Sequence, residues 1–252
     1  MLLITIVFAN NFLSARMAEN EFSAVKQFMQ TVGLQIDDVA WTVGRTQTIR
    51  YTSKFGQVNF ESLALNYTVY VDKGGGYTYL ANYSVGILLF NMPVSTYSIG
   101  NNYYERIFPS SDSSFLQKGA SAPVSYVYVI EKLPMNDGNL IRVVVAPSIR
   151  TLNSTISAGG EEKNYFKFYL PVLEQGSHPR LSQSVTLIGS SVSVKAESCN
   201  SIKISVAFPK ASLGFNADFF KFENTEEIVD VPDGSVIEFY TSEVIVSLGL
   251  HM

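Results

Sequence analysis

The first 44 residues carry a helical hydrophobic pattern that no proline interrupts. Residues 1–9 (MLLITIVFA) are apolar on every side, and from residue 22 onward apolar residues recur three and four positions apart in alternation. This spacing places them on one face of a helix, with polar side chains between them. We therefore predict one long helix over residues 2–43, ended by a glycine cap at Gly44. Its apolar stripe consists of Phe22, Val25, Met29, Val32, Ile36, Val39 and Val43.

The two halves of this predicted helix need different surroundings. We expect the stripe of the second half to pack on the protein's own sheet, with Trp41 as a core plug against the first strand. The first half is apolar all round, which favours a bilayer or identical helices around it. We expect the membrane or helix–helix contact to be made by Leu2, Leu3, Ile6, Val7 and Phe8. The nine apolar residues span about 14 Å as helix, roughly half of a bilayer's hydrocarbon core.

After Gly44 the hydrophobic period changes from that of a helix to the two-residue period of strands. Short strand-like segments recur every 8–12 residues or so without amphipathic helices between them, which favours an antiparallel β-sandwich. Asp137-Gly138 marks the clearest hairpin, between residues 124–132 and 140–146. A last hairpin is predicted between residues 235–240 and 243–248. The fold class is thus mainly β with one long N-terminal helix.

Two units follow from these patterns. Residues 1–44 form the hydrophobic and amphipathic helix, and residues 45–252 form a β-rich domain. The segment 151–163 (TLNSTISAGGEEK) is polar and contains two glycines, so we expect a break there and mark it as a candidate boundary between two sub-domains.

Composition narrows the function. Hydrophobic residues make up 46% of the chain and charged residues 16%, which argues against disorder. The net charge of −4 gives no basic surface for nucleic acid. Two histidines and the single Cys199 leave little material for histidine-dependent catalysis, a disulfide or a cysteine-built metal site. We therefore expect no enzyme, no catalytic residues, no cofactor and no metal, and we identify no small-molecule substrate.

Few individual residues suggest chemistry. We interpret His178 as an exposed loop residue and Cys199 as a buried inert thiol. Asp37 and Asp38 lie in the last turns of the helix, where the helix dipole disfavours acids. They can pair with Arg45 or Arg50 or with a neighbouring subunit, and outside such an interface we expect ordinary solvation.

Three N-x-S/T sequons permit glycosylation at a cell surface without arguing for it. They begin at Asn66, Asn82 and Asn153, and the surroundings of Asn153 are typical of a loop.

The order of a helix that is apolar first and amphipathic second, followed by an all-β domain, resembles type IV pilins. More narrowly, residues 34–51 (LQIDDVAWTVGRTQTIRY) resemble the junction of archaeal pilin-like and archaellin-like surface proteins, in which such a helix ends at a Gly-Arg turn and enters a β-sandwich. The resemblance covers residues 1–52. The family's basic leader does not precede the apolar stretch, so we expect the chain to begin inside the hydrophobic segment, with the signal truncated.

The resemblance implies an exported protein at the cell surface, held by its helix in the membrane or in a filament core, with its β domain outside. The leading hypothesis is a non-enzymatic structural or adhesive subunit that associates with itself or with other pilin-like subunits. The alternative is a monomeric, membrane-anchored β-sandwich that binds a surface glycan or an envelope protein. Its platform would be the aromatic residues Tyr77, Tyr79, Tyr83, Tyr97, Tyr103 and Tyr104.

Overall fold

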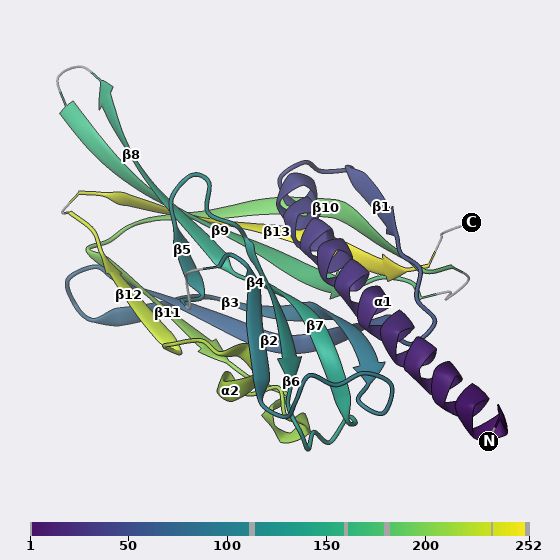
Figure 1. Ribbon diagram of the computed structural model, residues 1–252. Coiled ribbons are helices and arrows are strands. Elements are labelled where there is room, and N and C mark those ends of the chain that lie inside the picture. Colours follow the sequence, from purple (N-terminus) through teal and green to yellow (C-terminus); the bar gives the residue numbers. More distant parts are fainter. Residues whose placement is uncertain (1, 111–113, 159–160, 179–181, 233, 250–252) are drawn as a thin grey trace.

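The computed structural model describes residues 2–110, 114–158, 161–178, 182–232 and 234–249, and for residues 2–11, 158 and 161 it describes the backbone alone. Over these residues the fold is one long N-terminal helix and two curled β-sheets (Figure 1). The helix, α1, spans Leu2–Ala40. The predicted fold class, mainly β with one N-terminal helix, is confirmed.

The first sheet contains six strands within the described residues. Their order is β1 (Thr46–Arg50), β10 (Ser184–Ser198), β13 (Val236–Leu248), β9 (Glu161–Gln175), β8 (Ile149–Ala158) and β5 (Leu116–Lys118).

The second sheet has seven strands in the same described part of the chain. Their order is β12 (Glu226–Asp230), β11 (Ser201–Ala207), β2 (Gln57–Asp72), β3 (Tyr77–Pro93), β7 (Leu140–Pro147), β6 (Ser125–Glu131) and β4 (Tyr103–Phe108). A 3₁₀ turn (Ala211–Leu213) and the short helix α2 (Ala217–Phe220) follow β11.

The predicted last hairpin is wrong, and its correction changes the topology. Residues 236–248 form the single strand β13, which pairs antiparallel with β10 and parallel with β9. Thr241 and Ser242, where we placed the turn, stay paired with Ser193 and Val192 of β10. Neither is a glycine, asparagine or aspartate, so the chain has no residue there that readily adopts the positive φ of a two-residue hairpin turn. A second parallel pair joins β5 and β8, so the sandwich is mixed rather than purely antiparallel.

Several predicted short strands are continuous in the structure. The hydrophobic pattern predicts separate strands over residues 57–60 and 66–71, and the structure joins them into β2 through a bulge between Glu61 and Leu65, with Leu63 at a φ of 54°. The polar segment 151–163 is a paired hairpin rather than a break, since β8 and β9 stay in register from Arg150↔Tyr169 to Ala158↔Glu161. The predicted hairpin at Asp137-Gly138 is confirmed as β6 and β7, with Gly138 at a φ of 127°.

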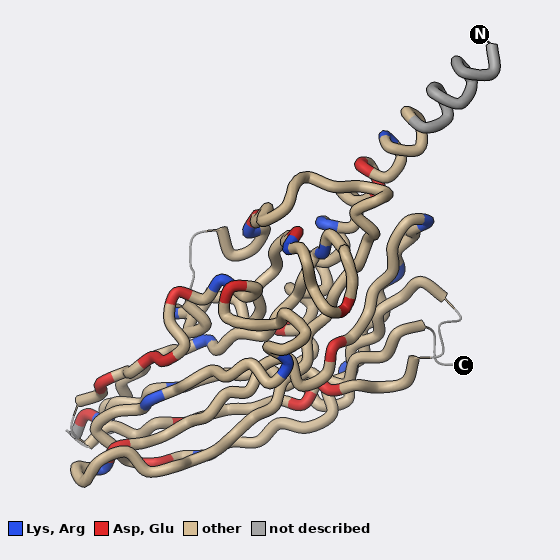
Figure 2. Tube along the Cα trace, turned by 90° about the horizontal axis from the view of Figure 1, so that it is seen from below, with Lys and Arg blue, Asp and Glu red and all other residues tan. Residues whose placement is uncertain are grey.

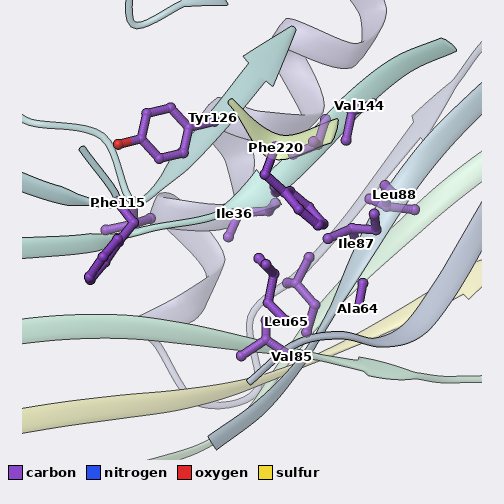
Figure 3. Close-up of a cluster of buried hydrophobic side chains, with 14 of the residues drawn as sticks. Ile36, Ala64, Leu65, Val85, Ile87, Leu88, Phe115, Tyr126, Val144 and Phe220 are labelled. Atoms are coloured by element: carbon purple, nitrogen blue, oxygen red, sulfur yellow. The ribbon is translucent and has the colours of Figure 1, made fainter. Parts of the chain in front are cut away.

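The helix belongs to the core of both sheets. It lies against β10 and β13 of the first sheet and against β6 and β7 of the second. Figure 3 shows Ile36 of α1 in one cluster with Leu65, Val85 and Leu88 of the second sheet and Phe220 of α2. The two sheets therefore share the helix as a common filling element.

Candidate functional site: the N-terminal helix

The predicted apolar stripe of α1 is buried. Phe22, Val25, Met29, Val32, Ile36 and Val39 are each at most 2% exposed. These residues, predicted to pack the helix on the sheet, belong to the hydrophobic core, and α1 lies against strands of both sheets. The helix ends three residues earlier than predicted, and Val43 in the following turn is 62% exposed. Gly44, at a φ of 82°, closes that turn before β1.

A glycine and a serine allow the helix to approach the second sheet closely. A Cβ at Gly33 would lie only 2.7 Å from Cγ2 of Val127 in β6. The hydroxyl of Ser125 donates a hydrogen bond to the carbonyl of Gly33 at 2.9 Å. This small, hydrogen-bonded contact fixes the position of α1 along β6.

Glu21 fixes the loop that connects the two sheets, residues 51–56, to the helix. One carboxylate oxygen accepts from the hydroxyl of Ser53 and the backbone N–H of Phe55, and the other accepts from the N–H of Lys54 at 2.8 Å. Hydrogen bonds to a charged acceptor are stronger than those between neutral groups. The loop from β1 to β2 is thus pinned at the point where α1 enters the protein.

The C-terminal end of α1 is fixed by its two adjacent aspartates. Asp37 accepts from Nε1 of Trp41 at 2.7 Å and pairs with Arg150 of β8 at 2.8 Å, while Asp38 pairs with Arg45. The predicted pairing with Arg45 is confirmed, and Arg150 is a partner that the sequence did not indicate. Both acids thereby gain a cation within their own chain.

Trp41 is half-buried and not the plug against the first strand that we expected. Its ring packs edge-to-face on Tyr169 of β9, with the centroids 5.1 Å apart. The hydrogen bond from its Nε1 to Asp37 keeps the polar edge of the ring at the surface of the core.

The N-terminal half of α1 leaves the body of the protein (Figure 2). Ala18 is the first buried residue described on it, and Phe12, Leu13 and Met17 are 57%, 60% and 47% exposed. The predicted contact residues Leu2, Leu3, Ile6, Val7 and Phe8 lie in its first turns, and their side chains are outside the described part of the structure. From Leu2 to Met17 the helix is about 24 Å long at 1.5 Å per residue.

A search of the described residues for a helix long and apolar enough to cross a membrane found none.

The three sequons all lie in strands. Asn82 of β3 and Asn153 of β8 are exposed, and Asn66 of β2 is half-buried between β3 and β11. The loop that we expected at Asn153 is strand β8, where Asn153 pairs with Phe166.

The tyrosines of the predicted aromatic platform do not form one surface. Tyr83 stacks on Phe239, and Tyr97 packs on Phe22 of the helix. Tyr77 and Tyr79 at the start of β3 are the most exposed members, at 39% and 63%. Packing inside the fold therefore takes up side chains that the sequence left available for a ligand.

The described residues contain no group of three or more histidine, cysteine, aspartate or glutamate side chains that could hold a metal ion. Cys199 is buried, and burial, with a smaller contribution from Glu197, raises the pKa of its thiol to about 11. Such a thiol is protonated at neutral pH and has little nucleophilic character.

Comparisons with models of known protein families, with curated proteins and with solved structures found no match.

Proposed function

We propose that this protein is a non-enzymatic cell-surface subunit, structural or adhesive, that is assembled or anchored through its N-terminal helix in the manner of type IV pilins. The observation that carries the proposal is the division of α1 into a half docked between two sheets and a half that projects with Phe12, Leu13 and Met17 exposed. The docked half is explained by the fold. On the projecting half, residues 12–17 are all exposed.

The projecting half favours contact with other helices. An isolated helix of about 16 residues is marginal in water, so a projecting one gains order from whatever covers it. The projecting half also carries Asn10 and Asn11, whose amides can hydrogen-bond between packed helices. These features support a shared helical core.

Lysine substitution on the projecting half tests the proposal. Replacing Ile6 and Val7 with lysine, and in a second variant Leu13 and Met17, should release the protein from the membrane or filament fraction of its native host. The charges would have to be buried against apolar neighbours, which is strongly unfavourable.

The matched control adds the same two charges to the docked half. Gln27→Lys with Thr31→Lys changes exposed positions of the same helix. Circular dichroism of all variants should show an unchanged β fold. Fractionation and electron microscopy that find the projecting-half variants still in membranes or filaments would contradict the proposal.

The second candidate is a monomeric, membrane-anchored binding module. The observation that favours it is a cavity of about 760 Å³ that residues of both sheets line. Gentle extraction from the native host separates the two candidates, because filaments or oligomers support the first and a monomer that binds a glycan supports the second.

A further inference from the structure

A polar cavity lies where one end of the two sheets meets the loop between β1 and β2. Its volume is about 760 Å³, within the range of roughly 300–1,000 Å³ that is typical of small-molecule sites. The wall formed by the second sheet contains Gln57, Asn59 and Asn91. The opposite wall contains Gln175 at the end of β9 and His178 in the loop after β9. The lining is therefore rich in amide groups.

The charges of the lining leave little net attraction for an ion. Its two acids, Glu61 and Asp137, are paired with Lys210 and Arg142. Lys54, the remaining charged residue of the lining, is exposed to solvent. An ionic ligand needs an uncompensated opposite charge, so the two pairs favour a neutral ligand over a cation. An acidic ligand would meet only the solvent-exposed charge of Lys54, which salt screens.

Three amide side chains of the lining are accessible: Gln57 and Gln175 are exposed and Asn59 is half-buried. Each amide offers a donor and an acceptor, which suits hydroxyl groups, because a hydroxyl also donates and accepts. Oδ1 of Asn91 and Nε2 of His178 have no hydrogen-bond partner among the described residues, but both atoms are buried and do not face a ligand in the cavity.

Two phenylalanines add apolar surface to this amide lining. Phe60 lies over Gly86 so closely that a Cβ there would be 2.1 Å from its Cζ, and its ring is 6.3 Å from that of His178. Phe55 belongs to the loop that Glu21 pins to α1. Aromatic rings held in place offer the apolar face of a sugar ring a surface while the amides reach its hydroxyls.

We propose that this cavity binds a short neutral oligosaccharide. The hydroxyls would bond to Gln57, Asn59 and Gln175, and the sugar rings would lie against Phe55 and Phe60. This inference goes beyond assembly through the helix and does not depend on whether the protein polymerises.

An extended peptide is the competing occupant. Residues 57–61 of β2 pair with β3 on one side, whereas β11 pairs with the other side of β2 only from Asn66 onward, so this stretch is a sheet edge to which a peptide strand could add. That edge is short. The N–H of Val58 already donates to the hydroxyl of Tyr51 at 3.1 Å, and the bulge after Glu61 interrupts the strand. Strand addition would therefore gain few backbone hydrogen bonds, and the sugar is the better fit.

Calorimetric titration of the full chain tests the proposal. The probes are neutral trisaccharides of glucose, mannose, galactose and N-acetylglucosamine, with a galacturonate trisaccharide as the charged counterpart and a valine–threonine hexapeptide as the peptide. We expect millimolar or tighter binding of at least one neutral sugar. Asn59→Ala and Gln57→Ala should each weaken it about fivefold, the effect of losing one hydrogen bond.

The control variant is Asn153→Ala, which removes an exposed amide on β8 outside the lining. It should leave the affinity unchanged. The melting temperature of Gln57→Ala should also be unchanged, because Gln57 is exposed. A loss of affinity that merely follows a loss of folded protein would count against the site.

Three results would overturn the proposal. They are no binding of any neutral sugar, binding that is equal in the Asn59→Ala variant, and stronger binding of the galacturonate or of the hexapeptide than of every neutral sugar.

Discussion

Replacing Ile36 by alanine should destabilise the protein far more than the same truncation two residues away. Ile36 is fully buried where α1 meets both sheets, whereas Leu34 on the same helix is 47% exposed. Ile36→Ala removes three carbon atoms from this core (Figure 3), worth about 2.4 kcal/mol of transfer free energy. The remaining cavity adds roughly 1 kcal/mol, which gives a loss of about 3 kcal/mol.

Leu34→Ala also removes three carbons, but about half of their surface is already in water and no closed cavity remains. We expect a loss of about 1 kcal/mol. Alanine has a higher helix propensity than isoleucine or leucine. The resulting gain in stability of a few tenths of a kcal/mol applies to both variants and does not alter the comparison between them. The difference of about 2 kcal/mol between the variants therefore measures burial.

Urea unfolding followed by circular dichroism, with linear extrapolation to water, measures both losses on the whole chain. Equal losses for the two variants would refute the docking of α1 between the sheets. A loss below about 1 kcal/mol for Ile36→Ala would do the same, because a helix that rests on the surface leaves no cavity when a side chain is shortened.

The remaining predictions concern the hydrogen bonds of Glu21 to the loop 51–56, two buried tyrosines and the Cys199 thiol. Glu21→Ala should cost about 2 kcal/mol and speed hydrogen exchange at the amides of residues 54 and 55, whereas Glu19→Ala, which loses an exposed pair, should change neither. Burial raises the pKa of the Tyr67 and Tyr128 phenols well above the ordinary value. The folded state therefore favours their neutral form, and the stability that this gives is complete below about pH 10 and is lost as the pH rises further. Unfolding curves measured at increasing alkaline pH would show this loss. Of these two, Tyr67→Phe loses a 2.9 Å hydrogen bond to the Pro147 carbonyl and should cost about 1 kcal/mol, whereas Tyr128→Phe removes a hydroxyl with no partner among the described residues and should be neutral or stabilising. Cys199, with its pKa raised to about 11, should react with a thiol reagent at pH 8 only after unfolding, and rapid labelling of the native protein would contradict its burial.

The sequence predicts the elements with strong local periodicity and misses those that depend on pairing at a distance. The stripe from Phe22 to Val39 repeats over many turns, so burial of one helix face follows from spacing alone. The merging of two predicted strands into β13 depends on neighbours on both sides, β9 and β10, which local pattern does not contain. The parallel pairing of β9 with β13 could not be predicted for the same reason.

The candidate sites divide in the same way. Asp38 finds Arg45 seven residues along the chain, and that pair could be predicted, whereas Arg150 reaches Asp37 from another strand. The polar cavity joins amides from β2, β3 and β9, and each amide alone is typical of a solvated strand position. His178, which we interpreted as an exposed loop residue, is half-buried and belongs to this lining.

The turns of α1 just before Ala18 are not buried by the described fold. Among the helix residues whose side chains are described, burial begins at Ala18, close to the start of the apolar stripe. Folding therefore accounts for the stripe but not for Phe12, Leu13 and Met17, whose exposure to water has a cost. The proposed assembly would cover these side chains. Because Glu21 joins the helix to the loop beside the polar cavity, the docked half keeps its structure whatever covers the projecting half. Assembly through residues 2–17 and binding in the cavity can therefore be tested independently on the same chain.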